Sequence, residues 1–391
     1  MFKRVRYYIF LKDVLILALS AFGGPQAHLA MFLDLMVTKR GYLSETDLIE
    51  LNALCQILPG PTSTQTITAI GFKIGGPNLA YLTLLVWMTP AVLIMTIMAI
   101  FIAMIPGEVQ FTQFIQPMAV GFVSFAAYRI SNKVVNTKTG IVIMIAAAVS
   151  AFYIRTPFLF PVLLLFAGAT TAFKYKAQPI EEKSGLKIKW GNFLLWGGVF
   201  IVAALLGSVT KSFPVIVTFE NFYRNGSLIF GGGDVLIPLL YTEFVEYKKL
   251  LEPSEFLSGY AMVRGIPGPV FSFSSYIGAM SMETQGFGVG GQIAGAIFAA
   301  MGIFLPGTFL IFFVIRFWES LKKYRIVKAS LEGISAASSG MVVAAAILMF
   351  QPLENNFQNF GITIGTFCLL AFTKIPAPFI ILTGLIAGIF I

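Results

Sequence analysis

Apolar stretches long enough to cross a lipid bilayer recur along the whole chain, separated by short polar segments. A membrane-spanning helix needs about 20 predominantly apolar residues, and several of the stretches approach or exceed that length. The predicted spans are Leu79–Ile105, Ile141–Ile154, Phe158–Phe173, Phe193–Val209, Gly288–Ile315, Gly340–Phe350 and Ile362–Ile391, the last of which is long enough for two closely joined helices. The pattern predicts an all-α, polytopic membrane protein.

Glycine and proline interrupt four further apolar segments near their middle. These segments are Val14–Val37, Leu48–Ile74, Leu228–Val245 and Phe256–Met280. Hydrocarbon does not solvate the backbone groups that such breaks free, so each break must be buried in protein or line a water-filled cavity. Proline favours the first position of a helix, and we expect Pro25, Pro61 and Pro269 to begin half-helices whose free N–H groups face the breaks.

The breaks form a repeat. The motif Phe22-Gly23-Gly24-Pro25 corresponds to Phe230-Gly231-Gly232-Gly233, and Pro59-Gly60-Pro61 corresponds to Pro267-Gly268-Pro269. Both pairs have the same offset of 208 residues (230 − 22 and 267 − 59). Two matching motifs in one register indicate that the chain contains two copies of one unit, and the site of a transporter commonly lies where such copies meet.

The domain organisation follows from this repeat. We predict a first membrane repeat in residues 1–176, a linker with one extra transmembrane helix in residues 177–212, and a second repeat in residues 213–391. A single unpaired crossing would invert the second copy. The predicted fold is therefore two inverted-topology repeats whose Gly/Pro-broken half-helices meet near the bilayer midplane.

Charge supports this topology. The basic start of the chain leads into an apolar stretch without a small-residue cleavage site, so the N-terminus is expected to stay on the cytoplasmic side of the inner membrane. With that orientation most basic clusters fall in the cytoplasm, as the positive-inside rule requires. These clusters are Lys39-Arg40, Arg129 with Lys133 and Lys138, Lys174–Lys189, and Arg316 to Lys328.

Composition narrows the function. The chain has 391 residues, of which 57% are hydrophobic and 12% charged, and its net charge is +9. The positive charges lie in short loops, so no nucleic-acid partner is expected. Cys55 and Cys368 have no ligand-spaced neighbours, and neither a metal nor a cofactor is predicted. No motif of an activated nucleophile, zinc site or phosphate loop is present, so the chain is not predicted to be an enzyme.

Anion binding is the chemistry that broken helices favour. A helix N-terminus carries about half a positive charge and several unpaired N–H donors, and up to four such ends could converge. Removing a dianion from water is costly, so a fixed cation is also needed, and Arg264 is the candidate unless it pairs with Asp234 or Glu243. The predicted substrate-binding residues are Gly23, Gly24, Pro25, His28, Gln56, Gly60, Pro61, Thr62, Ser63, Gly231, Gly232, Gly233, Arg264, Gly268 and Pro269.

Several single residues allow more than one interpretation. His28, the only histidine, could donate to an anion, shuttle protons, or pack with a backbone partner. Asp234 could cap a helix or bind a proton or cation, and Glu243 is a further ion-coupling candidate. Lys73 is expected to mark a cytoplasmic helix end. The breaks themselves could be hinges instead of a binding site.

At these positions the sequence resembles the chromate ion transporter family in its long form with two fused repeats. The resemblance covers nearly the whole chain. It rests on the two glycine motifs with His28 and Pro238, on Leu58–Pro61 with Gln56 and Gln65, and on Gly259-Tyr260 with Pro267–Pro269 and Phe271. It implies chromate export that confers resistance, with sulfate as a similar competitor. Arg264 and Asp234 depart from the family pattern, in which glutamine and an uncharged residue are expected.

The sequence leaves three transport modes open. Export of a dianion from an inside-negative cell gains about 2 × 2.3 kcal/mol per 100 mV, which favours an alternating-access exporter, with or without proton exchange. A sulfate-type uptake symporter and an anion channel lined by helix N-termini are the alternatives. The identity of the oxyanion and the oligomeric state stay open, a homodimer included.

Overall fold

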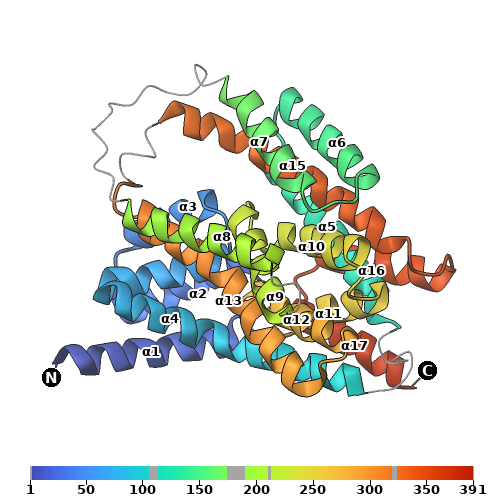
Figure 1. Ribbon diagram of the computed structural model, residues 1–391, viewed down its shortest axis with the longest axis horizontal. Helices are drawn as coiled ribbons and strands as arrows, with labels where there is room; N and C mark the ends of the chain where they lie inside the picture. Colours follow the sequence, from blue (N-terminus) through green and yellow to red (C-terminus); the bar gives the residue numbers. More distant parts are fainter. Residues whose placement is uncertain (1, 105–112, 174–189, 210–212, 319–323, 391) are drawn as a thin grey trace. The chain divides into compact units, whose positions relative to one another are not determined.

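All regular elements in the described part of the chain are helices. The computed structural model describes the chain except for residues 1, 105–112, 174–189, 210–212, 319–323 and 391 (Figure 1). The predicted Lys-rich linker therefore lies outside the described residues. The all-α class predicted from the apolar pattern is confirmed.

The helices follow the predicted order. The first repeat contains α1 (Phe2–Ser20), α2 (Pro25–Phe32), the π-helix η1 (Leu33–Lys39), α3 (Glu45–Ile57), α4 (Thr62–Met104), α5 (Ile115–Val134), α6 (Lys138–Tyr153) and α7 (Leu159–Ala172). The extra helix is α8 (Gly191–Val209). The second repeat contains α9 (Pro214–Leu228), α10 (Gly233–Tyr241), η4 (Thr242–Tyr247), α11 (Pro253–Gly265), η5 (Val270–Ser272), α12 (Phe273–Thr284), α13 (Gly288–Val314), α15 (Arg325–Phe350), α16 (Phe357–Phe372) and α17 (Ala377–Phe390).

The local backbone repeats in register. Helices α2 and α3 begin 208 residues before α10 and α11, respectively. Gly24 has φ 79° and ψ −168°, and its equivalent Gly232 has φ 84° and ψ −159°. Gly41, with φ 59°, corresponds to Lys249, with φ 53°, the one non-glycine residue of positive φ in the described chain. The two halves are therefore copies of one structural unit, as the sequence offset predicts.

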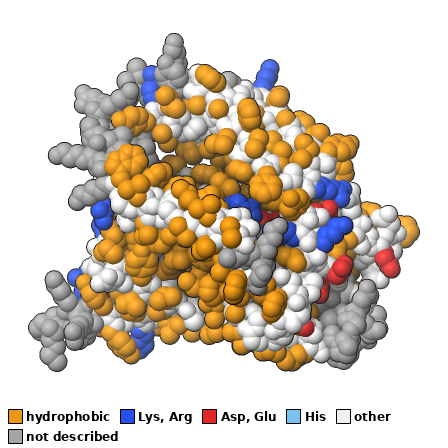
Figure 2. Space-filling model, in the orientation of Figure 1, with side chains coloured by type: hydrophobic (Ala, Val, Ile, Leu, Met, Phe, Trp, Pro, Cys, Tyr) orange, Lys and Arg blue, Asp and Glu red, His pale blue; other side chains and the backbone are white. Residues whose placement is uncertain are grey.

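Surface composition fits a membrane protein. Four described helices, α4, α8, α13 and α15, are long and apolar enough to cross a bilayer, and α6, α7, α16 and α17 are shorter apolar helices. Hydrophobic side chains cover most of the face shown in Figure 2. Only 6% of the apolar window of α8 is buried within the molecule, and lipid is the solvent in which such an unburied apolar helix is stable.

The helices group into two compact units, each of which takes elements from both repeats. Unit 1 comprises residues 1–104, 189–227 and 263–316, and unit 2 comprises residues 105–188, 228–262 and 317–391. Membership of a unit therefore does not follow the order of the repeats along the chain.

Unit 2 is built by reciprocal packing of the repeats. Helix α5 packs against α16 of the second repeat, and α15 packs against α6 and α7 of the first (Figure 1). Contact is close at glycines: a Cβ on Gly333 would collide with the carbonyl oxygen of Ala167. Helices α5 and α15 also touch, and the hydroxyls of Ser131 and Ser339 lie 2.7 Å apart. These two serines are 208 residues apart, and equivalent residues can meet only where a pseudo-twofold axis passes between them.

Unit 1 is organised around the two long helices. Helices α4, α12 and α13 pack against one another, and α1, α2 and α3 pack against α4. Helix α4 is kinked at Gly76, which has φ 74° and ψ −165° and precedes a proline. Lys73 lies one turn before this kink and forms a 2.6 Å ion pair with Asp47. Because Gly76 has non-helical angles at which two helices meet, Lys73 lies near the end of a helix, as predicted; that this end is cytoplasmic stays a prediction.

Candidate functional site

The first break separates α1 from α2. Gly24 adopts backbone angles that are almost exclusive to glycine, and it is the N-cap of α2. Pro25 occupies the first helical position, as predicted. No side chain caps this helix end, so its N–H groups stay directed into the break.

The two Pro-Gly-Pro breaks start their helices slightly later than predicted. The carbonyl of Pro61 accepts the first helical bond, from Gln65 N at 2.8 Å, so Pro61 is the N-cap of α4. Pro269 has an extended ψ of 131° and is the N-cap of the short helix η5, which leads into α12. The expectation that these two prolines occupy the first helical position is wrong by one residue, because an extended proline carries the chain out of the glycine turn before the helix begins.

Three breaks of unit 1 are linked through Ala21 and Trp87. The carbonyl oxygen of Ala21 accepts from Gly268 N at 2.9 Å and from the His28 ring at 3.1 Å. The His28 ring lies edge-on to Trp87 at 5.5 Å between centroids. Trp87 Nε1 donates to Thr64 Oγ1 at 3.1 Å, in the first turn of α4. The Ala21 carbonyl thus joins the second-repeat break at Gly268 to His28, and the buried Trp87 joins His28 to the start of α4.

Each Pro-Gly-Pro break also packs on the long helix of the other repeat. Gln65 Nε2 donates to the carbonyl of Pro59 at 2.7 Å and to that of Gly307 on α13 at 3.3 Å. A Cβ on Gly268 would come within 2.8 Å of the Cβ of Ala91 on α4. Gly307 and Ala91 each follow a proline within their long helix. A helix-interior proline removes a backbone hydrogen bond, so each break packs beside a locally weakened point of the long helix of the other repeat.

The remaining break belongs to unit 2 and carries charge. Asp234 lies in the first turn of α10 and pairs with Arg129 of α5 at 2.7 Å. Glu243 is fully buried and pairs with Lys248 at 2.7 Å. Each of the two carboxylates proposed as partners of Arg264 thus has a cationic partner within unit 2. Sequence reasoning placed Arg129 in a cytoplasmic loop and missed this pair, because nothing in the spacing of two residues 105 positions apart indicates contact.

The predicted site residues divide between the units. Unit 1 holds Gly23, Gly24, Pro25, His28, Gln56, Gly60, Pro61, Thr62, Ser63, Arg264, Gly268 and Pro269; unit 2 holds Gly231, Gly232, Gly233, Asp234 and Glu243. Gln56 and Arg264 occupy equivalent positions in the last turns of α3 and α11. Trp87 and Thr64 were not predicted, although a tryptophan within an apolar span offers a buried donor that has to find a partner.

A buried carboxylate fixes the segment between η1 and α3. Asp13 of α1 is 1% exposed and accepts from Arg40 at 2.8 Å and from the Tyr42 hydroxyl at 2.7 Å. Burial, together with the bond to Asp13, raises the pKa of Tyr42 to about 12. Tyr42 therefore remains a protonated donor at physiological pH.

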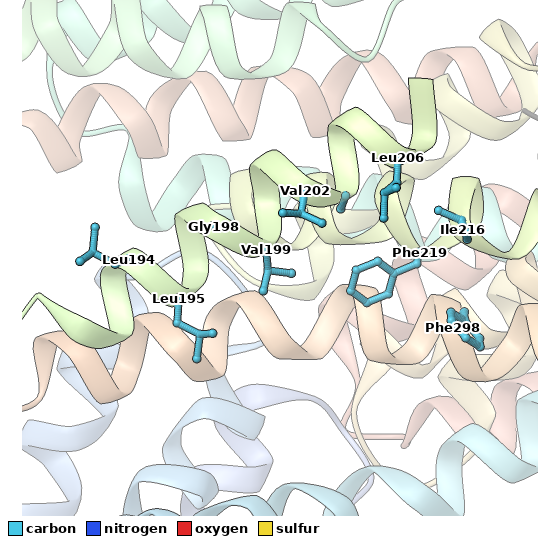
Figure 3. Close-up of a pocket in the computed structure, with 10 residues that line it drawn as sticks. Leu194, Leu195, Gly198, Val199, Val202, Leu206, Ile216, Phe219 and Phe298 are labelled. Atoms are coloured by element: carbon cyan, nitrogen blue, oxygen red, sulfur yellow. The ribbon is translucent and has the colours of Figure 1, made fainter. Parts of the chain in front are cut away.

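A hollow on unit 1 does not fit an anion. Helix α8 and residues of α9 and α13 line a pocket of about 460 Å³, toward which Leu195 and Val199 point along with Phe219 and Phe298 (Figure 3). All ten lining residues are apolar, so the pocket offers no charged side chain to replace the hydration of an ion.

The described residues contain no cluster of three or more His, Cys, Asp or Glu side chains that could hold a metal ion. Cys55 is buried, Cys368 is partly buried, and both are free thiols. The polar features of the described site are thus helix starts, hydroxyls, amides and a few charged pairs.

Comparison with known proteins finds a matching family model and several similar transporters. The family model described as "Chromate transporter" matches twice, over residues 9–173 and 216–389. An uncharacterized transporter of Methanocaldococcus jannaschii is 26% identical over 382 residues, covering 95% of this chain and 91% of the relative. The "Probable chromate transport protein" of Synechococcus elongatus is 25% identical over 377 residues (94% and 91%), and the "Chromate transport protein" of Pseudomonas aeruginosa is 25% identical over 391 residues (95% and 89%).

No solved structure matches the chain at a significant level. The double family match covers most of the sequence and coincides with the two structural repeats. The family consists of transporters, not enzymes, and its members carry ions across a membrane. The chain therefore belongs to the chromate transporter family.

Proposed function

We propose that this protein exports chromate or a similar tetrahedral oxyanion by alternating access. The observation that carries the proposal is the set of contacts in unit 1 around Ala21 and Trp87, where helix starts from both repeats come together. Uncapped helix N-termini and hydroxyls supply the several donors that a tetrahedral anion requires.

A fixed cation would complete the site. Several hydroxyls follow the breaks, and Ser272, Ser274 and Ser275 are fully buried. Arg264 stands at the position that Gln56 occupies in the first repeat, directly before the break that contacts Ala21. We assign it the neutralising charge for the anion, since helix ends alone do not offset the dehydration of a dianion.

The membrane potential supplies a driving force for export. A dianion that leaves an inside-negative cell gains about 2 × 2.3 kcal/mol per 100 mV. Uptake would require co-transported cations to overcome the same term. Proton exchange can add to the driving force, and the candidates for it are Asp234, Glu243 and His28.

We further propose that the two repeats are inverted relative to each other, with the N-terminus in the cytoplasm of a plasma-membrane protein. The basic clusters and the single extra helix α8 support this topology. The broken helices would move against the remaining spans and open the anion site alternately to each side.

Flux from proteoliposomes under an imposed potential tests the proposal. Chromate flux should saturate with concentration and should be accelerated by a potential that is negative on the side from which chromate leaves. Arg264→Gln, which copies Gln56, should lower the flux at low chromate concentrations. The matched control is Lys374→Gln, which removes an exposed cation between α16 and α17.

Two results would contradict the proposal. Inward chromate movement driven by a proton or sodium gradient would favour the uptake symporter. Unitary currents without saturation or exchange would favour a channel. Sulfate, the chemically similar anion, should compete with chromate when it is added in excess to the same flux assay.

A further inference from the structure

Two buried acceptor atoms at the breaks of unit 1 have no hydrogen-bond partner. They are Nδ1 of His28 and Oε1 of Gln65, and both side chains are 1% exposed. Native proteins leave few buried polar atoms unsatisfied, and each such atom calls for an explanation. Both residues belong to the first repeat and lie at the starts of its broken helices.

The hydrogen-bond pattern fixes the character of the His28 atom. Nε2 faces the carbonyl oxygen of Ala21 at 3.1 Å; a carbonyl only accepts, so Nε2 carries the hydrogen. The ring contacts Phe32 and Trp87, and no carboxylate in the described chain bonds to it. Without an acidic partner a buried ring is stable in its uncharged form. Nδ1 is therefore an acceptor that lacks a donor.

The charged groups on neighbouring helices do not change this assignment. Helix α2 packs mainly against η1 and α4. On η1, Asp34 pairs with Lys39 at 2.7 Å, and on α4, Lys73 pairs with Asp47 at 2.6 Å. Each of these two carboxylates is neutralised by its own lysine and does not supply a counter-charge to the His28 ring.

The Gln65 amide is oriented just as clearly. Its Nε2 lies 2.7 Å from the carbonyl of Pro59 and 3.3 Å from that of Gly307. A flipped amide would point its oxygen at two carbonyl oxygens and would lose both bonds. Nε2 would also be within 3.0 Å of a Cβ on Gly60, which places the amide directly over the break. Oε1 is thus a second unpaired acceptor, at the start of α4.

We infer that this site selects oxyanions that carry a proton over fully ionised oxyanions. The inference rests on the proposed function and specifies its substrate class. Hydrogen chromate is a monoanion, so its gain on leaving an inside-negative cell is about 2.3 kcal/mol per 100 mV, which still favours export. A fully ionised tetrahedral anion only accepts hydrogen bonds; it can use the helix N–H groups and the hydroxyls but leaves His28 Nδ1 and Gln65 Oε1 unsatisfied beside a negative charge. A hydrogen oxyanion donates its O–H to one of these acceptors and accepts from the N–H groups with its other oxygens.

The second repeat lacks this feature. The equivalents of His28 and Gln65, at an offset of 208 residues, are Leu236 and Phe273. Neither side chain carries an acceptor atom. The second repeat offers at its Pro-Gly-Pro break the unpartnered hydroxyls of Ser274 and Ser275, which can donate to an anion as well as accept; the two groups that can only accept belong to the first repeat. His28→Leu converts its histidine into the residue of the second repeat.

Binding at a single pH near neutrality tests the inference. Purified full-length protein in detergent is titrated with chromate, which is partly protonated at this pH, with hydrogen phosphate, and with sulfate and selenate, which are fully ionised. Sites built to bond a substrate hydroxyl reject analogues that lack it by large factors. We expect chromate and hydrogen phosphate to bind at least about tenfold more tightly than sulfate and selenate.

The variants separate selectivity from folding. His28→Leu removes one of the two acceptors and should lower the chromate-to-sulfate affinity ratio, mainly by weakening chromate. His28→Leu combined with Gln65→Phe, which copies both residues of the second repeat, should bring the ratio close to one. His28→Gln keeps an N–H donor and an acceptor oxygen and should retain part of the preference. The matched control is Thr96→Val, because Thr96 bonds only the Val92 carbonyl within its own helix; its ratio should equal that of the wild type. Melting temperatures without anion report whether each variant folds.

The outcomes are distinguishable. Equal affinity of the wild-type protein for sulfate and chromate overturns the selection for a proton but leaves oxyanion transport intact, and this comparison needs no variant. An unchanged ratio in the folded double variant His28→Leu with Gln65→Phe also overturns it. Failure of every oxyanion to bind overturns the proposed function itself.

Discussion

Replacing Gly24 with alanine isolates the energetic cost of the first break. A Cβ at Gly24 would meet no atom within 4 Å, so crowding contributes nothing to the effect. The backbone angles, φ 79° and ψ −168°, belong to a region that other residues enter at a cost of about 1–3 kcal/mol. We expect Gly24→Ala to destabilise the protein by about that amount and to slow transport, because relaxation of the strain turns the N–H groups of α2 away.

Gly197→Ala in α8 is the matched control. Its added Cβ also meets nothing within 4 Å, but Gly197 lies inside a regular helix, where alanine is favoured over glycine by about 0.5–1 kcal/mol. The two substitutions, with the same chemistry and the same free space, should therefore shift the melting temperature in detergent in opposite directions. If Gly24→Ala unfolded no earlier than the wild type, the left-handed break would not be a strained, glycine-dependent feature and the reasoning would fail.

Three further changes test other parts of the structure. Tyr42→Phe removes a hydrogen bond to the buried carboxylate of Asp13 and should cost about 1.5–3 kcal/mol. Because the pKa of Tyr42 is raised to about 12 in the folded protein, the protonated hydroxyl contributes its full stability below pH about 10. This contribution is lost as the pH rises through about 12, so the melting temperature of Tyr42→Phe should fall less steeply with alkaline pH than that of the wild type. Arg129→Gln and Asp234→Asn should show a coupling energy of about 0.5–3 kcal/mol in a double-mutant cycle of melting; additive effects would refute their pairing. Gly333→Ala should destabilise by about 3 kcal/mol or more through overpacking against α7, and wild-type expression and melting would contradict that contact.

Much of the architecture could be predicted from the sequence because it depends on local rules. Glycine and proline mark the breaks, and their 208-residue offset identifies the repeat. The structure reproduces that offset in helix starts and in the φ angles of Gly24 and Gly232. The prediction for Pro61 was wrong by one position, since the exact start of a helix depends on the turn that precedes it.

The contacts of the site could not be predicted, because they join residues remote in sequence. The bond from Gly268 N to the Ala21 carbonyl spans two repeats, and the pair of Arg129 with Asp234 depends on how α5 packs against α10. Periodicity identifies which side chains face inward but not which neighbours they meet. The placement of Arg264 as the charge for the anion stays a prediction.

The serine pair between α5 and α15 explains why fusion of the two copies matters. In a dimer of identical single-repeat chains, a residue on the symmetry axis faces itself, and only a self-complementary side chain is tolerated there. A hydroxyl meets this condition because it donates and accepts at once, as Ser131 and Ser339 still do. Joining both copies in one polypeptide lets equivalent residues differ, so histidine can face one break while leucine occupies the equivalent position at the other. Duplication followed by fusion thus lets a symmetric scaffold acquire a chemically one-sided interior.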